Sequence, residues 1–83
     1  MPAMPHALPE AFPHFENAVR RLREEDAHFE KMASQYDALS DAIRRAHAKR
    51  ASAQDARVRT MHRQRLWLLD EIAERLREDQ ATR

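Results

Sequence analysis

The sequence predicts an all-α protein, an antiparallel two-helix coiled-coil hairpin. Three observations lead to this fold class. Large apolar side chains recur every seven residues in the first half of the chain, a second apolar stripe with helical spacing follows in the other half, and glycine is absent. All four prolines occur within the first 13 residues, so no obligate helix breaker follows Pro13.

Residues 1–11 are expected to form a flexible, proline-rich tail. They contain three of the four prolines, and each proline removes a backbone donor and disfavours helix in the residue before it. Pro13 suits the first turn of a helix, where its missing N–H would have no partner. The helical hairpin is therefore expected over residues 12–81.

A first helix is expected over about residues 13–49. Its heptad stripe consists of Phe15, Leu22, Phe29, Tyr36 and Ile43. A second apolar row lies beside this stripe and consists of Phe12, Val19, Met32, Leu39 and Ala46. Asp26 interrupts the apolar pattern, and we interpret it as the point where the stripe changes phase. The alternative is a carboxylate that reaches solvent at the edge of the seam.

The chain is expected to turn at about residues 49–53, because residues 47–57 contain no large apolar side chain. Ser52 and Asp55 match a capping box, which marks the start of a helix. A second helix is then expected over about residues 53–80, although one unbroken helix is an alternative. The seam residues of the second helix are Val58, Met61, Leu68, Leu69, Ile72 and Leu76.

Self-association is expected from the unequal lengths of the two helices. At about 1.5 Å per residue the first helix would be roughly 55 Å long and the second roughly 40 Å, so the first would overhang at its N-terminal end. The overhang would leave Phe12, Phe15 and Val19 uncovered. We therefore expect a homo-oligomer, a dimer or a tetramer, that buries the stripe in a larger helical bundle.

The middle of the chain is strongly basic. Residues 44–65 contain eight basic side chains and one acidic one, a net charge of +7. A hairpin would gather this charge at its turn end, where it suits the phosphates of RNA or DNA. The alternatives are a solubilising surface, self-contact, or docking to an acidic protein or membrane surface. The candidate contact residues are Arg44, Arg45, Lys49, Arg50, Arg57, Arg59 and Arg63.

Trp67 is the second functional candidate, because it falls on the polar face of the second helix. Tryptophan often anchors protein interfaces, although single exposed apolar residues are also normal. A contact with a protein partner is therefore one interpretation of Trp67. An antiparallel hairpin would allow His47 and His62 to approach each other near the turn.

Composition argues against an enzyme. Without glycine the chain lacks phosphate-binding loops, and without cysteine it lacks disulfides and thiolate metal sites. Glu25 and His28 have the Glu-x-x-His spacing of di-iron helical bundles, but one copy is a weak signal, so no metal or cofactor is expected. No apolar run approaches the roughly 20 residues that span a membrane, and no signal peptide is evident, so a cytoplasmic protein is expected.

Two sequence runs are typical of a known family. They are Glu-Asp-Ala-His-Phe at residues 25–29 and Leu-x-Leu-x-Asp-Glu-Ile at residues 66–72. On these runs the chain resembles the YdcH family of small bacterial proteins of unknown function, over about residues 11–77. The resemblance implies a helical hairpin and a bacterial source, and it implies no catalytic residues. The chain departs from that pattern by a turn without glycine and by Trp67, at a position that is usually small or polar.

Overall fold

The computed structural model describes residues 11–49 and 55–82 of this 83-residue chain. The described residues form one turn of 3-10 helix and three α-helices, and no β-strand occurs among them. The prediction of an all-α protein is confirmed. Most of the expected tail and turn, including Arg50 and Ser52, lies outside the described residues.

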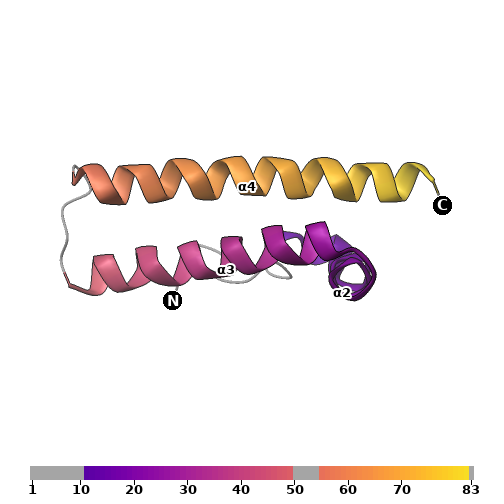
Figure 1. The fold of residues 1–83 in the computed structure, drawn as a ribbon, viewed down its shortest axis with the longest axis horizontal. Helices are drawn as coiled ribbons and strands as arrows, with labels where there is room; N and C mark the ends of the chain where they lie inside the picture. The colour runs from indigo at the N-terminus through magenta and orange to yellow at the C-terminus, as the bar shows by residue number, and fades with distance from the viewer. Residues whose placement is uncertain (1–10, 50–54, 83) are drawn as a thin grey trace.

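Two long helices lie side by side and run in opposite directions (Figure 1). They are α3, Ala27–Ala48, and α4, Ala56–Ala81. This arrangement excludes the alternative of one unbroken helix. The side chain of Asp55 caps α4 by accepting a hydrogen bond of 2.8 Å from the backbone N–H of Arg57. The expected capping box would place Ser52 at the N-cap and Asp55 three residues into the helix, whereas Asp55 is the N-cap residue of α4.

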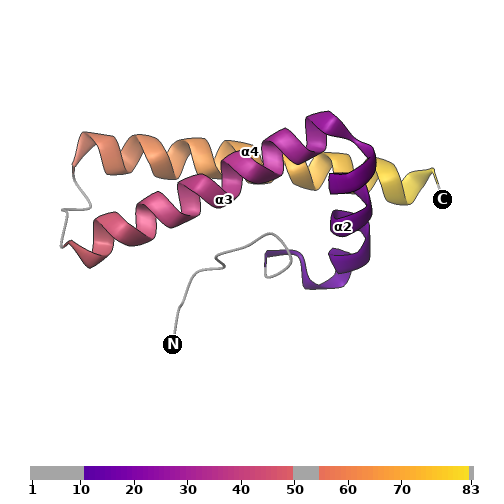
Figure 2. The ribbon, with the colours of Figure 1, turned by 60° about the horizontal axis from the view of Figure 1, so that its bottom comes forward.

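A shorter helix, α2, Glu16–Glu25, crosses the end of the antiparallel pair (Figure 2). A 3-10 turn, η1, Pro13–Phe15, precedes it. Between α2 and α3 the backbone of Asp26 is extended, with φ −124° and ψ 104°. The Asp26 carboxylate accepts a hydrogen bond of 3.1 Å from the backbone N–H of Phe29 and so caps the N-terminus of α3.

The single helix expected over residues 13–49 is therefore wrong. Aspartate in a helix interior is a modest helix former, whereas at an N-cap it satisfies a free backbone donor. The change of direction at Asp26 also lets α2 bury its apolar side chains against α3 and α4. A straight continuation of α3 would extend beyond the pair and leave these side chains exposed. Asp26 marks where the apolar pattern changes, but it does so by ending one helix and starting another.

The expected overhang of the first helix is wrong for the same reason. α4 has 26 residues and α3 has 22, so α4 is the longer member of the pair, and α2 packs against both. Val19 is 1% exposed, and the half-buried rings of Phe12 and Phe15 lie against the core and 6.5 Å from each other. The aromatic side chains that were expected to need a second copy are thus covered within one chain.

The core fills the space between α2, α3 and α4. Of the fifteen expected seam residues ten are buried, namely Val19, Leu22, Phe29, Met32, Tyr36, Ile43, Val58, Leu68, Ile72 and Leu76. The other five, Phe12, Phe15, Leu39, Met61 and Leu69, are partly buried. Ala18 and Ala33 complete the core, and their small side chains allow α2 and α3 to approach their neighbours.

Ion pairs fasten α2 to the long helices. Arg21 of α2 bonds Asp79 of α4 at 2.6 Å, and Asp79 is itself buried. Arg23 of α2 reaches α3, where it bonds Glu30 at 2.6 Å and Asp37 at 3.1 Å. Within the described residues, no helix is both long enough and apolar enough to cross a membrane.

Candidate functional site

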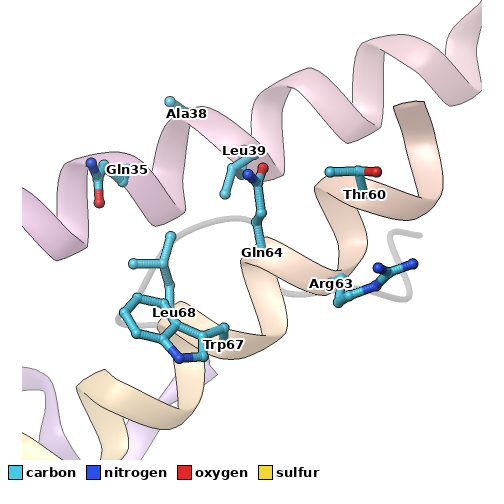
Figure 3. Close-up of a pocket in the computed structure, with 8 residues that line it drawn as sticks. All are labelled: Gln35, Ala38, Leu39, Thr60, Arg63, Gln64, Trp67 and Leu68. Atoms are coloured by element: carbon cyan, nitrogen blue, oxygen red, sulfur yellow. The ribbon is translucent and has the colours of Figure 1, made fainter. Parts of the chain in front are cut away.

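A shallow apolar groove runs between α3 and α4 (Figure 3). The volume of this open groove is about 630 Å³. Leu39 of α3 and Leu68 of α4 line its inner part, since both belong to or pack against the core. Its remaining lining residues are Gln35, Ala38, Thr60, Arg63, Gln64 and Trp67.

Trp67 stands at the border of this groove with 61% of its surface exposed. The next residue, Leu68, points about 100° away around the helix and is buried in the core. Trp67 therefore lies on the outer side of α4, with its indole beside the Leu68 side chain (Figure 3). The other large exposed apolar residue, Leu66, is 58% exposed and does not line the groove.

The charged side chains on the two sides of Trp67 along α4 have opposite signs. Arg63 lies one turn before it, and Asp70 and Glu71 lie one turn after it. All three are exposed, and none has an ion-pair partner within the part of the chain that the structure describes. The surface on either side of Trp67 thus carries charge that the chain itself does not neutralise.

The basic residues gather where α3 ends and α4 begins. Arg44 and Arg45 both bond Asp41, and the hydrogen bond from Arg44 is the largest cause that lowers the pKa of this carboxyl. Asp41 therefore offsets part of the charge that was assigned to anion contact. Arg50, another of these candidates, lies outside the described residues.

The remaining basic candidates are Lys49, Arg57, Arg59 and Arg63. All four are exposed, and no carboxylate pairs with them among residues 11–49 and 55–82. Lys49 and Arg57 line one shallow depression together with Arg45, and Asp55 lies in the same depression. Arg63 instead lines the groove beside Trp67, so the structure divides the basic candidates between two places.

Arg65 belongs to the basic segment of residues 44–65, but its guanidinium faces the core. It donates to the Ser40 hydroxyl at 2.8 Å and to the Tyr36 hydroxyl at 2.7 Å, and its central carbon lies 4.7 Å from the centre of the Tyr36 ring. Burial raises the pKa of Tyr36. Arg65 therefore joins α4 to α3 and is not part of a surface for anions.

Glu25 and His28 do not share a helix face, because Asp26 separates α2 from α3. Glu25 forms an ion pair of 3.5 Å with Arg21. The described residues contain no group of three or more histidine, aspartate or glutamate side chains arranged to hold a metal ion.

The expected approach of His47 and His62 is confirmed. Their ring centres lie 5.9 Å apart with an angle of 66° between the planes. Because His47 lies on α3 and His62 on α4, this contact links the two long helices near the basic end.

Neither the groove nor the polar links between the helices follow from the sequence pattern. Among these links, Arg21 bonds Asp79, Arg75 bonds Asp26, Arg65 bonds Tyr36, and Arg23 bonds Glu30 and Asp37. Apolar periodicity does not show which charged side chains turn inward. The buried Asp79 carries no pattern in the sequence that distinguishes it from the exposed acids around it.

The described fold and surface define a small all-α protein, built on two antiparallel helices with a third across their end. Residues 29–76, more than half of the chain, match the family described as protein of unknown function (DUF465). The chain belongs to this family. The match covers most of α3 and α4 and includes Trp67, whereas α2 lies outside it. The expectation of a small uncharacterised family is confirmed.

No curated protein matches the chain, and no solved structure matches it.

Proposed function

We propose that this chain is a non-enzymatic, cytoplasmic interaction protein that binds another protein chain in the groove beside Trp67. The observation that carries the proposal is a tryptophan, 61% exposed, at the border of an apolar groove on an otherwise polar helix face. Burial of a large aromatic side chain supplies much of the binding energy in many interfaces. The uncharged Gln35, Ala38 and Gln64 line the groove without a charge that would have to be desolvated.

The proposal includes a helical hairpin that forms a homo-oligomer. The antiparallel packing of α3 and α4 supports the hairpin, and we infer that this uncharacterised family is the one to which the YdcH resemblance points. The heptad stripe was expected to hold the copies together. Its central residues Phe29, Tyr36 and Ile43 are 0% exposed within one chain, so we assign the association to the Trp67 groove instead.

Affinity capture with two matched variants tests the proposal. Trp67→Ala removes the ring beside the groove, whereas Leu66→Ala removes a similarly exposed apolar side chain outside it. The tagged full chain is expected to bind its partners, Trp67→Ala is expected to lose them, and Leu66→Ala is expected to keep them. Identical captured proteins and identical oligomer size for the wild type and Trp67→Ala would contradict the proposal.

The second candidate function is binding of RNA or DNA at the basic end. The observation that favours it is the depression lined by Arg45, Lys49 and Arg57, because several cations close together release counterions when they meet phosphates. Arginine also suits phosphate through its planar fork of donors.

A double charge reversal tests this second candidate without touching the groove. Arg57→Glu with Arg59→Glu is expected to abolish binding to mixed cellular RNA at low salt, and Arg20→Glu, on α2, serves as the control. RNA binding that persists in the double variant would exclude the nucleic-acid function. RNA binding that is lost equally in the control would show that only net charge matters.

A further inference from the structure

Charge is unevenly distributed along the face of α4 that carries Trp67. Around Trp67, at helical spacing, lies a face that we call the Trp67 face, with the basic residue Arg63 before the tryptophan and acidic residues after it. All of its members are exposed: Thr60, Arg63, Gln64, Trp67, Asp70, Glu71 and Glu74. The half before Trp67 therefore carries the positive charge of Arg63, whereas the half after it carries the negative charges of Asp70, Glu71 and Glu74.

We propose that the occupant of the groove is a second copy of this chain, bound through an antiparallel contact between the two α4 helices about a two-fold axis at Trp67. This inference rests on the proposed function, in which the groove holds copies of the chain together, and it specifies how two copies meet. In such a contact a residue before Trp67 meets a residue equally far after Trp67 in the other copy. The residue four positions before Trp67 in one copy, for example, lies beside the residue four positions after Trp67 in the other copy.

This pairing brings opposite charges together. Arg63 comes to the level of Glu71 of the second copy, with Asp70 of the second copy only one residue away, and the two-fold axis repeats the contact. Thr60 comes to the level of Glu74 and Gln64 to the level of Asp70. A parallel arrangement would instead set Arg63 against Arg63 and Glu71 against Glu71, which is unfavourable.

The chain itself leaves these charges available. Arg63, Asp70 and Glu71 have no ion-pair partner among the described residues, whereas Glu74 is engaged with Arg77 at 2.7 Å. The α3 side of the groove presents Gln35 and Ala38, which carry no charge to oppose the approach of the second copy. Trp67 lies at the centre of the contact, where interface residues exclude water most completely.

Charge reversal in two separate chains provides the test. Arg63→Glu gives a chain with acids on both sides of Trp67, and Glu71→Arg gives a chain with bases on both sides. Each variant alone is expected to form its dimer at least about tenfold more weakly than the wild type, because like charges then face each other.

An equimolar mixture of the two variants is expected to recover dimers. The introduced glutamate of one variant then faces the introduced arginine of the other. In the symmetry-related contact, the unchanged Glu71 of the first variant faces the unchanged Arg63 of the second. Both contacts therefore join opposite charges again, as they do in the wild type.

Sedimentation equilibrium of the purified full chain measures these dimers against a monomer mass of 9.8 kDa. The concentrations extend to about 100 µM, and salt is kept low so that the charge effect is not screened. Arg20→Glu and Glu24→Arg are the matched controls, because both residues are exposed on α2, outside the groove, and both variants are expected to dimerise like the wild type. Circular dichroism checks that each variant keeps its helix content.

If a charge reversal lowers the helix content, the neutral variants Arg63→Gln and Glu71→Gln are used in place of the reversed ones. Each neutral variant is expected to dimerise about threefold more weakly than the wild type. Dimers that are insensitive to these changes, or charge-reversed variants that do not recover on mixing, would overturn the proposed contact. A monomeric wild type would overturn self-pairing altogether. The protein-binding function is judged separately, by whether Trp67→Ala changes the capture of proteins other than this chain.

Discussion

Arg75 of α4 donates a hydrogen bond of 3.1 Å from Nε to Oδ2 of Asp26, the residue that separates α2 from α3. Oδ1 of the same carboxylate accepts from the backbone N–H of Phe29 at 3.1 Å. One side chain therefore starts α3 and also ties this junction to α4. This carboxylate therefore helps to hold α2 across the end of the long helices, together with the ion pairs of Arg21 and Arg23 and the buried side chains of Val19 and Leu22.

Asp26→Ala is expected to lower the free energy of unfolding by about 1–2 kcal/mol, because it removes the helix cap together with the bond from Arg75. Urea denaturation followed by circular dichroism measures the change. Glu24→Ala is the control, since Glu24 is exposed and has no ion pair among the described residues, and it is expected to change the free energy by less than about 0.5 kcal/mol. An equal effect of the two substitutions would show that Asp26 does not hold the junction.

Acid is expected to destabilise the fold through Asp26. The hydrogen bond from the Phe29 backbone is the largest cause that lowers the pKa of Asp26 in the folded chain. A carboxyl whose pKa is lower in the folded chain contributes stability at pH values above its unfolded pKa of about 4, and this stability is lost as pH falls through the folded pKa. Glu30 behaves in the same way, because the hydrogen bond from Arg23 lowers its pKa.

The unfolding free energy of Asp26→Asn is therefore expected to depend less steeply on pH than that of the wild type between about pH 5 and pH 2. Asparagine keeps the capping ability but cannot be protonated in this range. Urea titrations at several pH values measure the two slopes. Parallel curves for the wild type and Asp26→Asn would contradict the role assigned to the Asp26 carboxylate.

Arg65→Ala is expected to cost about 2–3 kcal/mol, because it leaves the buried hydroxyls of Tyr36 and Ser40 without the charged donor that bonds both. Arg65→Lys is expected to recover only part of this loss, since an ammonium does not reproduce the planar fork or its stacking on Tyr36. Arg59→Ala, at an exposed position of the same helix, provides the control in urea denaturation. A full recovery by lysine would mean that charge alone is required.

Trp67→Ala is expected to leave the stability of the folded chain within about 0.5 kcal/mol of the wild type, because the ring is 61% exposed. Phe29→Ala, at a fully buried ring, is expected to cost about 3–5 kcal/mol. Urea denaturation at a concentration low enough to keep the chain monomeric measures both changes. A loss above about 2 kcal/mol for Trp67→Ala would place this ring in the core and remove it from the proposed interface.

The wild type offers an optical measurement of the groove, because Trp67 is its only tryptophan. Its emission is expected to shift to shorter wavelength as the protein concentration rises and the ring leaves water. The double variant Arg63→Glu with Glu71→Arg is expected to keep the shift, since it exchanges both members of the charge pair. Emission that stays constant over the range where the mass doubles would place Trp67 outside the contact.

The sequence determined the helical class and the inward faces of α3 and α4. Apolar side chains at heptad and helical spacing leave water when the two stripes face each other, and Phe29, Tyr36, Ile72 and Leu76 are accordingly buried. The approach of His47 and His62 follows from the same antiparallel arrangement. Candidate contact residues were also visible as departures from the pattern, Trp67 above all.

Only the tertiary structure decided where the first helix breaks and which charged side chains turn inward. Asp26 is compatible with a helix interior, a seam edge or a cap, and the folded chain uses it as a cap that also bonds Arg75, 49 residues away in the sequence. Arg65 is likewise one of many arginines until Tyr36 and Ser40 lie beside it. Periodicity reports local burial, whereas these contacts join residues that are distant in the sequence, and their free energy exists only once the chain has folded.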